Sequence, residues 1–215
     1  MAKGDGTGLD TRERLVHAAG EMFSQHGFQS TSIRAISQRA KANVAAVNYH
    51  FGHKEGLYSA VLEHALSWAA AKYPRDLGLS TEASAEEALK AFIKSFLLQL
   101  LDEGRPAWHG KLMAREMIAP TALLDQVIED ILGPLHKRLA VIVAEVLGSS
   151  TDNETVRFCT LSIIGQCVYY HNARLVIGRL YYQKFGPEET EALSNHIIQF
   201  SLGALKWLAI PTHSG

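Results

Sequence analysis

The chain has 215 residues, which is enough for one large domain or two modest ones. Hydrophobic residues make up 47% and charged residues 20%, values that are typical of a folded globular protein and exclude a disordered one. No apolar run approaches the roughly 18 residues that a membrane-spanning helix needs, and the first residues lack the apolar core of a signal peptide. Cys159 and Cys167 form neither a disulfide framework nor a zinc motif. We therefore expect a cytoplasmic protein without membrane segment, metal or cofactor.

Charge is distributed unevenly along the chain, although the formal net charge is only −1. Residues 1–58 carry seven Lys or Arg and five Asp or Glu, whereas residues 59–215 carry fourteen and seventeen. The window 22–54 contains no acidic residue at all. A positive, acid-free surface is what contact with a polyanion requires. The alternative at this point is a chance cluster in a short window.

The N-terminal part predicts three short helices. Apolar residues recur every three or four positions from Leu15 to Phe23, which is the stripe of an amphipathic helix. A second stripe runs from Ile33 to Ala40, and a third from Val44 to Phe51. The residues expected at the helix ends are Gly27 as a C-terminal stop, Thr31 or Ser32 as the second N-cap, and Asn43 as the third N-cap.

The rest of the chain predicts longer helices and no strands, so the expected fold class is all-α. A fourth helix should run from Lys54 to before Pro74, followed by a loop over 74–84. Pro134 should kink or break the segment in which it lies, because proline removes a backbone donor. Further helices are expected over 89–101, 106–118, 121–147, 152–183 and 187–208.

These elements suggest a division near residue 53. Residues 1–53, of which 1–10 are expected to be flexible, fit a helix-turn-helix domain because only a short turn separates the second and third helices. About 50 residues bury little core alone, so this domain should lean on the helix that begins at Lys54. Residues 54–215 form the larger helical domain of this division.

The third helix has the composition that a DNA-recognition helix needs. Its first turn is small or polar, which lets the backbone approach base edges in the major groove. Asn43 and Asn48 are both suited to bind adenine, but Asn43 is equally suited to be only a helix cap. Thr31 and Ser32 stand at a helix N-terminus, where free N–H groups attract phosphate.

The same segment resembles the DNA-binding domain of the TetR family of transcriptional regulators. The resemblance rests on residues 28–36 and 40–58, with the string Asn48-Tyr49-His50-Phe51 followed by Lys54-Glu55 and Leu57-Tyr58. It implies a dimeric regulator that binds double-stranded operator DNA, commonly palindromic, and that a small molecule controls. The larger domain is similar to the CecR-type subgroup over residues 112–121 and 162–166.

The resemblance also implies roles for single residues. It assigns Thr31, Tyr49, His50 and Lys54 to the DNA backbone, and Arg34, Val44 and Ala45 to the bases. The chain departs from the commonest family pattern because Asn48 stands where tyrosine is usual and the tyrosine follows at Tyr49. The individual roles of these two residues are therefore open. The expected DNA-binding set is Thr31, Ser32, Arg34, Asn43, Val44, Ala45, Asn48, Tyr49, His50 and Lys54.

The alternatives are structural. His50 can be packed under the fourth helix, and Arg39 and Lys41 can belong to a solvated face.

The larger domain carries candidates for a dimer interface and for an effector pocket. The last two long helices are apolar enough to pack against a second copy, with packing inside one subunit as the rival interpretation. Polar and aromatic side chains also interrupt apolar helices, and buried polar groups need partners, which a ligand can supply. A structural ion pair through Arg115 or Glu116 is the favoured alternative for those two. The expected effector-binding residues are Trp108, His109, Arg115, Glu116, Gln166, Tyr169, Tyr170 and Asn172.

Two other functions are the alternatives to a ligand-responsive DNA-binding repressor. A helical enzyme with His109 and Glu116 as acid and base is disfavoured because no nucleophile elbow, phosphate loop or metal-spaced histidine pair is present. A helical scaffold or small-molecule binding protein without specific DNA binding is disfavoured by the acid-free window and by the positions of Arg34 and Lys54.

Overall fold

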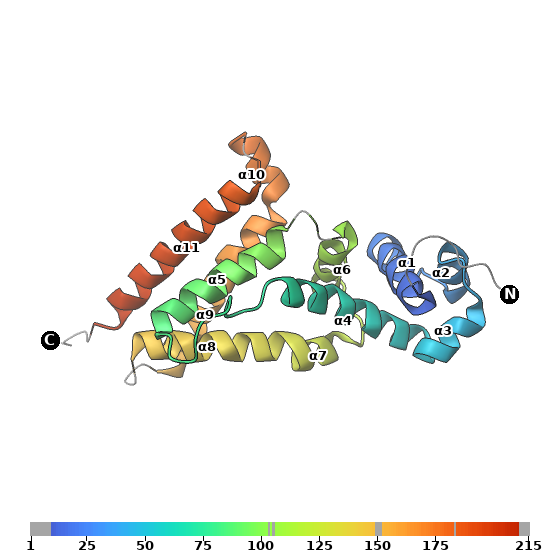
Figure 1. Cartoon of the computed structure of the whole chain (residues 1–215), viewed down its shortest axis with the longest axis horizontal. Helices are drawn as coiled ribbons and strands as arrows, with labels where there is room; N and C mark the ends of the chain where they lie inside the picture. Colours follow the sequence, from blue (N-terminus) through green and yellow to red (C-terminus); the bar gives the residue numbers. More distant parts are fainter. Residues whose placement is uncertain (1–9, 103, 105, 149–151, 183, 211–215) are drawn as a thin grey trace. The chain divides into compact units, whose positions relative to one another are not determined.

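The computed structural model describes residues 10–102, 104, 106–148, 152–182 and 184–210, and within these ranges every regular element is helical, as expected (Figure 1). The chain forms two compact units. The first consists of Met1–Trp68 and Gly104–Ile128, and the second of Ala69–Glu103 and Glu129–Gly215. Apart from Asp10, the segment 1–10 that was expected to be flexible lies outside the described residues. None of the described helices is long and apolar enough to cross a membrane.

The first three helices begin and end at the residues that local chemistry predicts. Asp10 caps α1 by accepting a hydrogen bond from the Glu13 amide at 2.8 Å, and Gly27 ends it with a φ of 84°. Ser32, and not Thr31, caps α2, while Asn43 caps α3. The bounds are α1 Thr11–His26, α2 Ile33–Arg39 and α3 Val44–Phe51.

Three further helices lie wholly or partly in the first unit: α4 (Lys54–Lys72), α6 (Ala107–Ile118) and α7 (Leu124–Val127). Helix α6 packs beside α1, so closely that a Cβ on Gly20 would lie 2.5 Å from the Trp108 ring. This approach requires glycine at position 20. The small helices thus gain a shared core, whose fully buried members include Leu15, Phe23, Ile36, Val47, Leu57 and Leu112.

Imidazole and indole rings meet in this core. The His64 ring lies 5.1 Å from the His17 ring, 6.1 Å from Trp108 and 5.8 Å from His109, measured between centroids. Burial lowers the pKa of His64, and the neighbouring His17 lowers it further. The folded state therefore favours the neutral form of His64.

The second unit is a bundle around one apolar core. Helices α5, α8, α9 and α11 contact one another and contribute its buried residues, among them Phe92, Leu139, Ile163 and Ile197. A capping box between Ser84 and Glu87 starts α5. The bounds are α5 Ala85–Leu101, the π-helical turn Ile128–Leu132, α8 Gly133–Leu147, α9 Asn153–Asn172, α10 Arg174–Leu180 and α11 Pro187–Leu208.

Two expectations about these helices have different outcomes. The helix before Pro134 does change, as expected: a π-helical turn ends at Leu132 and α8 begins with Pro134 in its first turn. The expectation of one helix over 152–183 is wrong. Helix α9 ends at Asn172, since Ala173 has φ −92° and ψ 4°, and α10 follows as a separate helix.

Protonation of His64 should destabilise the protein. Because its pKa in the folded state lies below the unfolded value near 6.5, the unfolded chain binds more protons in this range. We expect the urea midpoint of the wild type to fall between pH 7.5 and pH 5. In His64→Gln the fall should be smaller, and an equal fall in both proteins would contradict the assignment.

Candidate functional site

Helix α3 presents one exposed face. Val47 is completely buried and anchors the helix, whereas Val44 is 42% exposed and Tyr49 is 85% exposed. Ala45 and Asn48 are exposed beside them. Positions 44, 45, 48 and 49 share one side of a helix because they are one, three and four residues apart. Val44 and Ala45, which the resemblance assigns to the bases, therefore lie with Asn48 and Tyr49 on one exposed surface that no described residue of the first unit covers.

Two arginines on α2 differ in their partners. Both side chains are exposed, but the Arg39 guanidinium forms an ion pair with Glu21 on α1. Arg34 forms no ion pair or side-chain hydrogen bond with the residues that the structure describes. Glu21 directly precedes the acid-free window and neutralises Arg39. Arg34 thus remains an uncompensated positive charge.

The residues at the start of α2 have separate roles. The Thr31 side chain is only 3% exposed, and its hydroxyl donates a hydrogen bond to the Gly27 carbonyl at 2.7 Å. This bond ties the end of α1 to the start of α2 and leaves the hydroxyl turned away from solvent. Ser32 is exposed, and its oxygen accepts from the Ala35 amide at 3.2 Å.

Lys54 begins α4 and lies at the loop before α2. Its ammonium donates to the Gln29 carbonyl at 3.4 Å and stands 4.4 Å from the centre of the Phe28 ring. Both contacts keep the charge on the half-exposed border of the first unit, where no acidic side chain among the described residues pairs with it.

The structural alternative applies to Asn43 but not to His50. The Asn43 side chain accepts from the Ala45 amide at 2.9 Å, so it serves as a helix cap whatever else it contacts. His50 is exposed, with its ring 4.9 Å from the Tyr49 ring, and is not packed under α4.

Four of the expected effector residues lie on α6 in the first unit, where they pack in the core or form hydrogen bonds with other segments. Trp108, His109 and Glu116 are buried. The Glu116 carboxylate, 1% exposed, accepts from the Tyr58 hydroxyl at 2.6 Å and from both the amide and the hydroxyl of Thr121 at 2.7 and 2.8 Å. Burial, and then this hydrogen bond, raises the pKa of Tyr58.

Arg115 reaches a different segment from Glu116. Its guanidinium donates to the carbonyls of Gln25 and His26 at 3.5 and 3.4 Å, which are orphan carbonyls at the end of α1. The two residues therefore do not pair with each other, but each links α6 to another segment.

The other four expected effector residues lie on α9 in the second unit. Tyr169 and Tyr170 border a hollow of about 450 Å³ between α9, α10 and α11. The Gln166 amide bonds back to the Ser162 carbonyl at 3.4 Å, and Asn172 is exposed. Of the four expected effector residues on α9, only Tyr169 and Tyr170 line this hollow.

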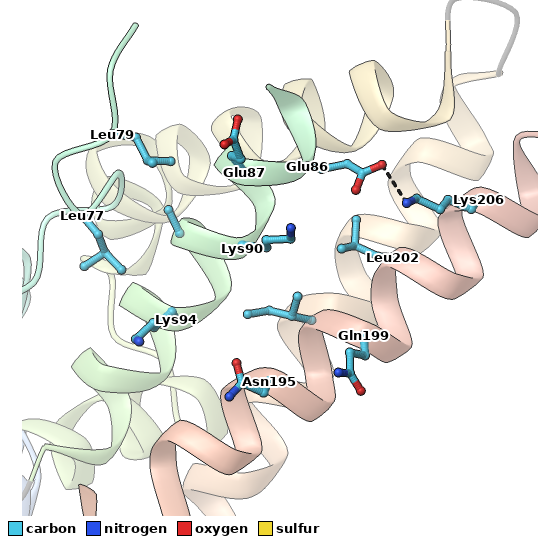
Figure 2. A pocket seen from close by; sticks show the side chains of 12 residues that line it. Leu77, Leu79, Glu86, Glu87, Lys90, Lys94, Asn195, Gln199, Leu202 and Lys206 are labelled. Carbon is cyan, nitrogen blue, oxygen red and sulfur yellow. Dashed lines mark ion pairs between the residues drawn. The ribbon is translucent and has the colours of Figure 1, made fainter. Parts of the chain in front are cut away.

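A larger groove, about 670 Å³ in volume, lies between α5 and α11 and was not predicted. Figure 2 shows Lys90 and Lys94 on α5 and Asn195 and Gln199 on α11 among the residues that line it. Lysines four residues apart are a signal that could have indicated one wall. The opposite wall comes from a helix about a hundred positions later, and no local pattern links the two.

No group of three or more His, Cys, Asp or Glu among the described residues is placed to hold a metal ion.

Comparison with known proteins decides the family. Residues 15–61 match the model of bacterial regulatory proteins of the tetR family, and residues 85–205 match that of the C-terminal domain of the HTH-type transcriptional dual regulator CecR. The chain belongs to the TetR family of DNA-binding transcriptional regulators, with a CecR-type C-terminal domain. The second match alone covers more than half of the chain.

Individual relatives agree with this assignment. The chain is 27% identical to the dual regulator CecR of Shigella flexneri, over 88% of this chain and 89% of the relative. It is 30% identical to the transcriptional repressor NicS of Pseudomonas putida, over 76% and 77%.

Solved structures show the same fold. A transcriptional regulator from Rhodococcus sp. matches with a TM-score of 0.64 at 20% identity, over 91% of this chain and 97% of its own. The ketosteroid transcriptional regulator KstR2 of Mycobacterium tuberculosis matches with 0.62 at 18% identity, over 94% and 98%.

Removing the Tyr58 hydroxyl should destabilise this TetR-family chain. In Tyr58→Phe the buried Glu116 carboxylate loses one of its three donors, and we expect the unfolding free energy to fall by about 1–3 kcal/mol. Tyr49→Phe, in the same unit but exposed, should change it by less than about 0.5 kcal/mol. Urea unfolding followed by circular dichroism measures both, and equal values would show that the Tyr58–Glu116 bond is not important for stability.

Proposed function

We propose that the protein is a cytoplasmic, dimeric repressor that binds a palindromic operator through α3 and leaves it when a small-molecule effector binds. The observation that carries the proposal is the exposed, acid-free surface of α2 and α3 in a chain of the TetR family. A major groove accepts one α-helix, and the small side chains at the start of α3 allow a close approach.

The proposed contacts follow exposure and charge. Arg34, Val44, Ala45 and Asn48 contact base edges, because they are exposed on α2 and on the free face of α3. The residues proposed to bind the DNA backbone are Ser32, Tyr49, His50 and Lys54. Thr31 is left out of the proposed set because its hydroxyl is buried, and Asn43 contributes as the cap that begins α3.

The proposed dimer interface is the exposed apolar face of α9 and α11. Phe158 on α9 is 54% exposed, and Phe200 and Trp207 on α11 are 61% and 68% exposed. On the same two helices, a Cβ on Gly165 or Gly203 would meet no atom within 4 Å. Mid-helix glycine is unfavourable by about 0.5–1 kcal/mol, and a closely crossing partner helix would explain both. The opposite face of these two helices packs inside the subunit, where its core residues are Ile163, Cys167, Leu193, Ile197 and Leu205.

Release from the operator requires an effector that binds more tightly to the conformation in which the two α3 helices of the dimer do not fit the operator. A ligand shifts such an equilibrium only by its difference in affinity between the two forms. Helix α4 carries Lys54 at its first residue and ends at Lys72 in the second unit, so we propose it as the element that the effector moves. The name of NicS supports repression, whereas CecR is called a dual regulator. Independent binding of effector and operator in a joint titration would contradict this mechanism.

The operator contact can be tested with two arginines of the same helix. Arg34→Ala should weaken binding to the DNA upstream of the protein's own gene by about tenfold and make the slope of log affinity against log salt shallower by about one unit. Arg39→Ala, whose guanidinium is already paired with Glu21, should leave that slope nearly unchanged. Fluorescence anisotropy at four salt concentrations measures both variants.

A scrambled DNA of equal length is the control for sequence specificity. If Arg34→Ala binds like the wild type on specific and scrambled DNA alike, the α2–α3 surface is not the DNA-binding face. If the wild type shows no preference for any genomic fragment in a selection experiment, the non-DNA scaffold becomes the better interpretation.

A charge on the proposed interface should separate the subunits. Phe200→Glu places a carboxylate where the partner helix would pack, and we expect the dimer dissociation constant to rise at least a hundredfold. Val141→Glu, at an equally exposed apolar position on α8, should leave the dimer intact. Sedimentation velocity distinguishes monomer from dimer, and a Phe200→Glu protein that is still dimeric would show that this face is not the dimer interface.

A further inference from the structure

Arg75 occupies an unusual place in the second unit. It follows α4 in the connection to α5, and its guanidinium carbon lies 5.6 Å from the centre of the Phe92 ring and 5.0 Å from that of Phe96. Phe92 is completely buried and Phe96 nearly so. The cation is thus held against the apolar core of the bundle.

No negative charge among the described residues compensates Arg75. Its Nη1 atom is buried and has no hydrogen-bond partner among the described residues, and the guanidinium forms no ion pair with any of them. The adjacent carboxylate, Asp76, is already engaged, because it pairs with Arg138 at 3.8 Å and accepts from the Gly78 amide at 3.1 Å. Arg75 and Arg138 together carry two positive charges against one negative charge.

This arrangement is unfavourable in the ligand-free protein. Burial first, and then the charge of Arg138, lowers the pKa of Arg75 to about 10, so the group is still protonated at neutral pH. A buried cation is normally paired, and a buried N–H without an acceptor lowers stability. The ring faces of Phe92 and Phe96 stabilise the cation, but they do not accept the in-plane hydrogen atoms of Nη1.

We infer that Arg75 binds the carboxylate of the effector, which is therefore an organic acid. This inference rests on the proposed function, since it names the ligand class of the effector-controlled domain. The planar guanidinium matches a carboxylate in a two-point hydrogen bond and would supply the acceptor that Nη1 lacks.

The rival explanation is structural: Arg75 would stabilise the bundle through its contacts with the two phenyl rings. The two explanations differ in the ligand-free protein. If Arg75 is retained for a ligand, Arg75→Met keeps the length of the side chain, removes an uncompensated charge and leaves the melting temperature unchanged or higher. If its role is structural, the same substitution lowers the melting temperature and does not affect carboxylate binding.

The experiment measures thermal unfolding of the full-length protein with two pairs of probes. Sodium octanoate and sodium benzoate are compared with the neutral octanamide and benzamide, at an ionic strength held constant with sodium chloride. We expect the carboxylates, and not the amides, to raise the melting temperature of the wild type. The dissociation constant should be at least tenfold weaker in Arg75→Met and intermediate in Arg75→Lys, which keeps the charge without the planar fork.

Arg157→Met is the matched control. Arg157 also lies over a phenyl ring, 4.8 Å from the centre of Phe158, but it is exposed and pairs with Glu154. Its substitution should leave carboxylate binding unchanged. Equal stabilisation by acids and amides, no stabilisation by either acid, or wild-type affinity in Arg75→Met would each overturn the inference.

A parallel operator-binding assay keeps this inference separate from the proposed function. Arg75→Met should bind operator DNA like the wild type but resist release by the carboxylates. If the wild type binds no operator, the proposed function fails, while the thermal data still decide whether Arg75 binds a carboxylate. If a neutral compound releases the operator and no carboxylate binds, the proposed function stands and the Arg75 inference is wrong.

Discussion

The buried carboxylate of Glu116 is the constraint on which the arrangement of the first unit depends. It accepts hydrogen bonds from the Tyr58 hydroxyl on α4 and from Thr121 in the turn that follows α6. A charge at this depth is tolerated only with such partners, so α4 and α6 must meet in one register. Helix α1 packs on α6 through the contact of Gly20 with Trp108, and α2 and α3 pack on α1 in turn. The exposed face of α3 is held by this chain of contacts.

Compensation of charge separates the cations that the fold itself accounts for from the two that we propose to bind ligands. Arg39 pairs with Glu21, and Arg115 caps the end of α1, so the fold itself accounts for both. Arg34, on the surface, and Arg75, against an apolar core, have no such partner in the described part of the chain. An anionic ligand is the simplest physical reason to keep a cation uncompensated, whether that ligand is a DNA phosphate and base edge or a carboxylate.

The sequence predicted the exposed faces of α2 and α3 better than it predicted the surroundings of the expected effector residues. The faces of α2 and α3 follow from helical periodicity, which is a local property, and the TetR family resemblance rests on a contiguous segment. The effector residues were inferred from polar groups on apolar helices, and this signal does not distinguish a ligand from another helix. Glu116 illustrates the ambiguity, since its partners Tyr58 and Thr121 satisfy it completely within the fold. Arg75 was missed because it lies in a loop, where no periodicity marks burial.

The amino-acid sequence alone predicted the all-α class, the N-cap at Asn43, the stop at Gly27 and the family, and it left Thr31 and Ser32 as the two candidates for the N-cap of α2. Each of these features depends on residues that are neighbours along the chain. Only the tertiary structure decided which charged groups are paired, which apolar faces are left exposed and where long helices end. These properties depend on contacts between segments tens of residues apart, such as the one between Arg75 and Phe96. The free energy of such contacts comes from burial and pairing in three dimensions, and no local pattern in the sequence specifies the partner.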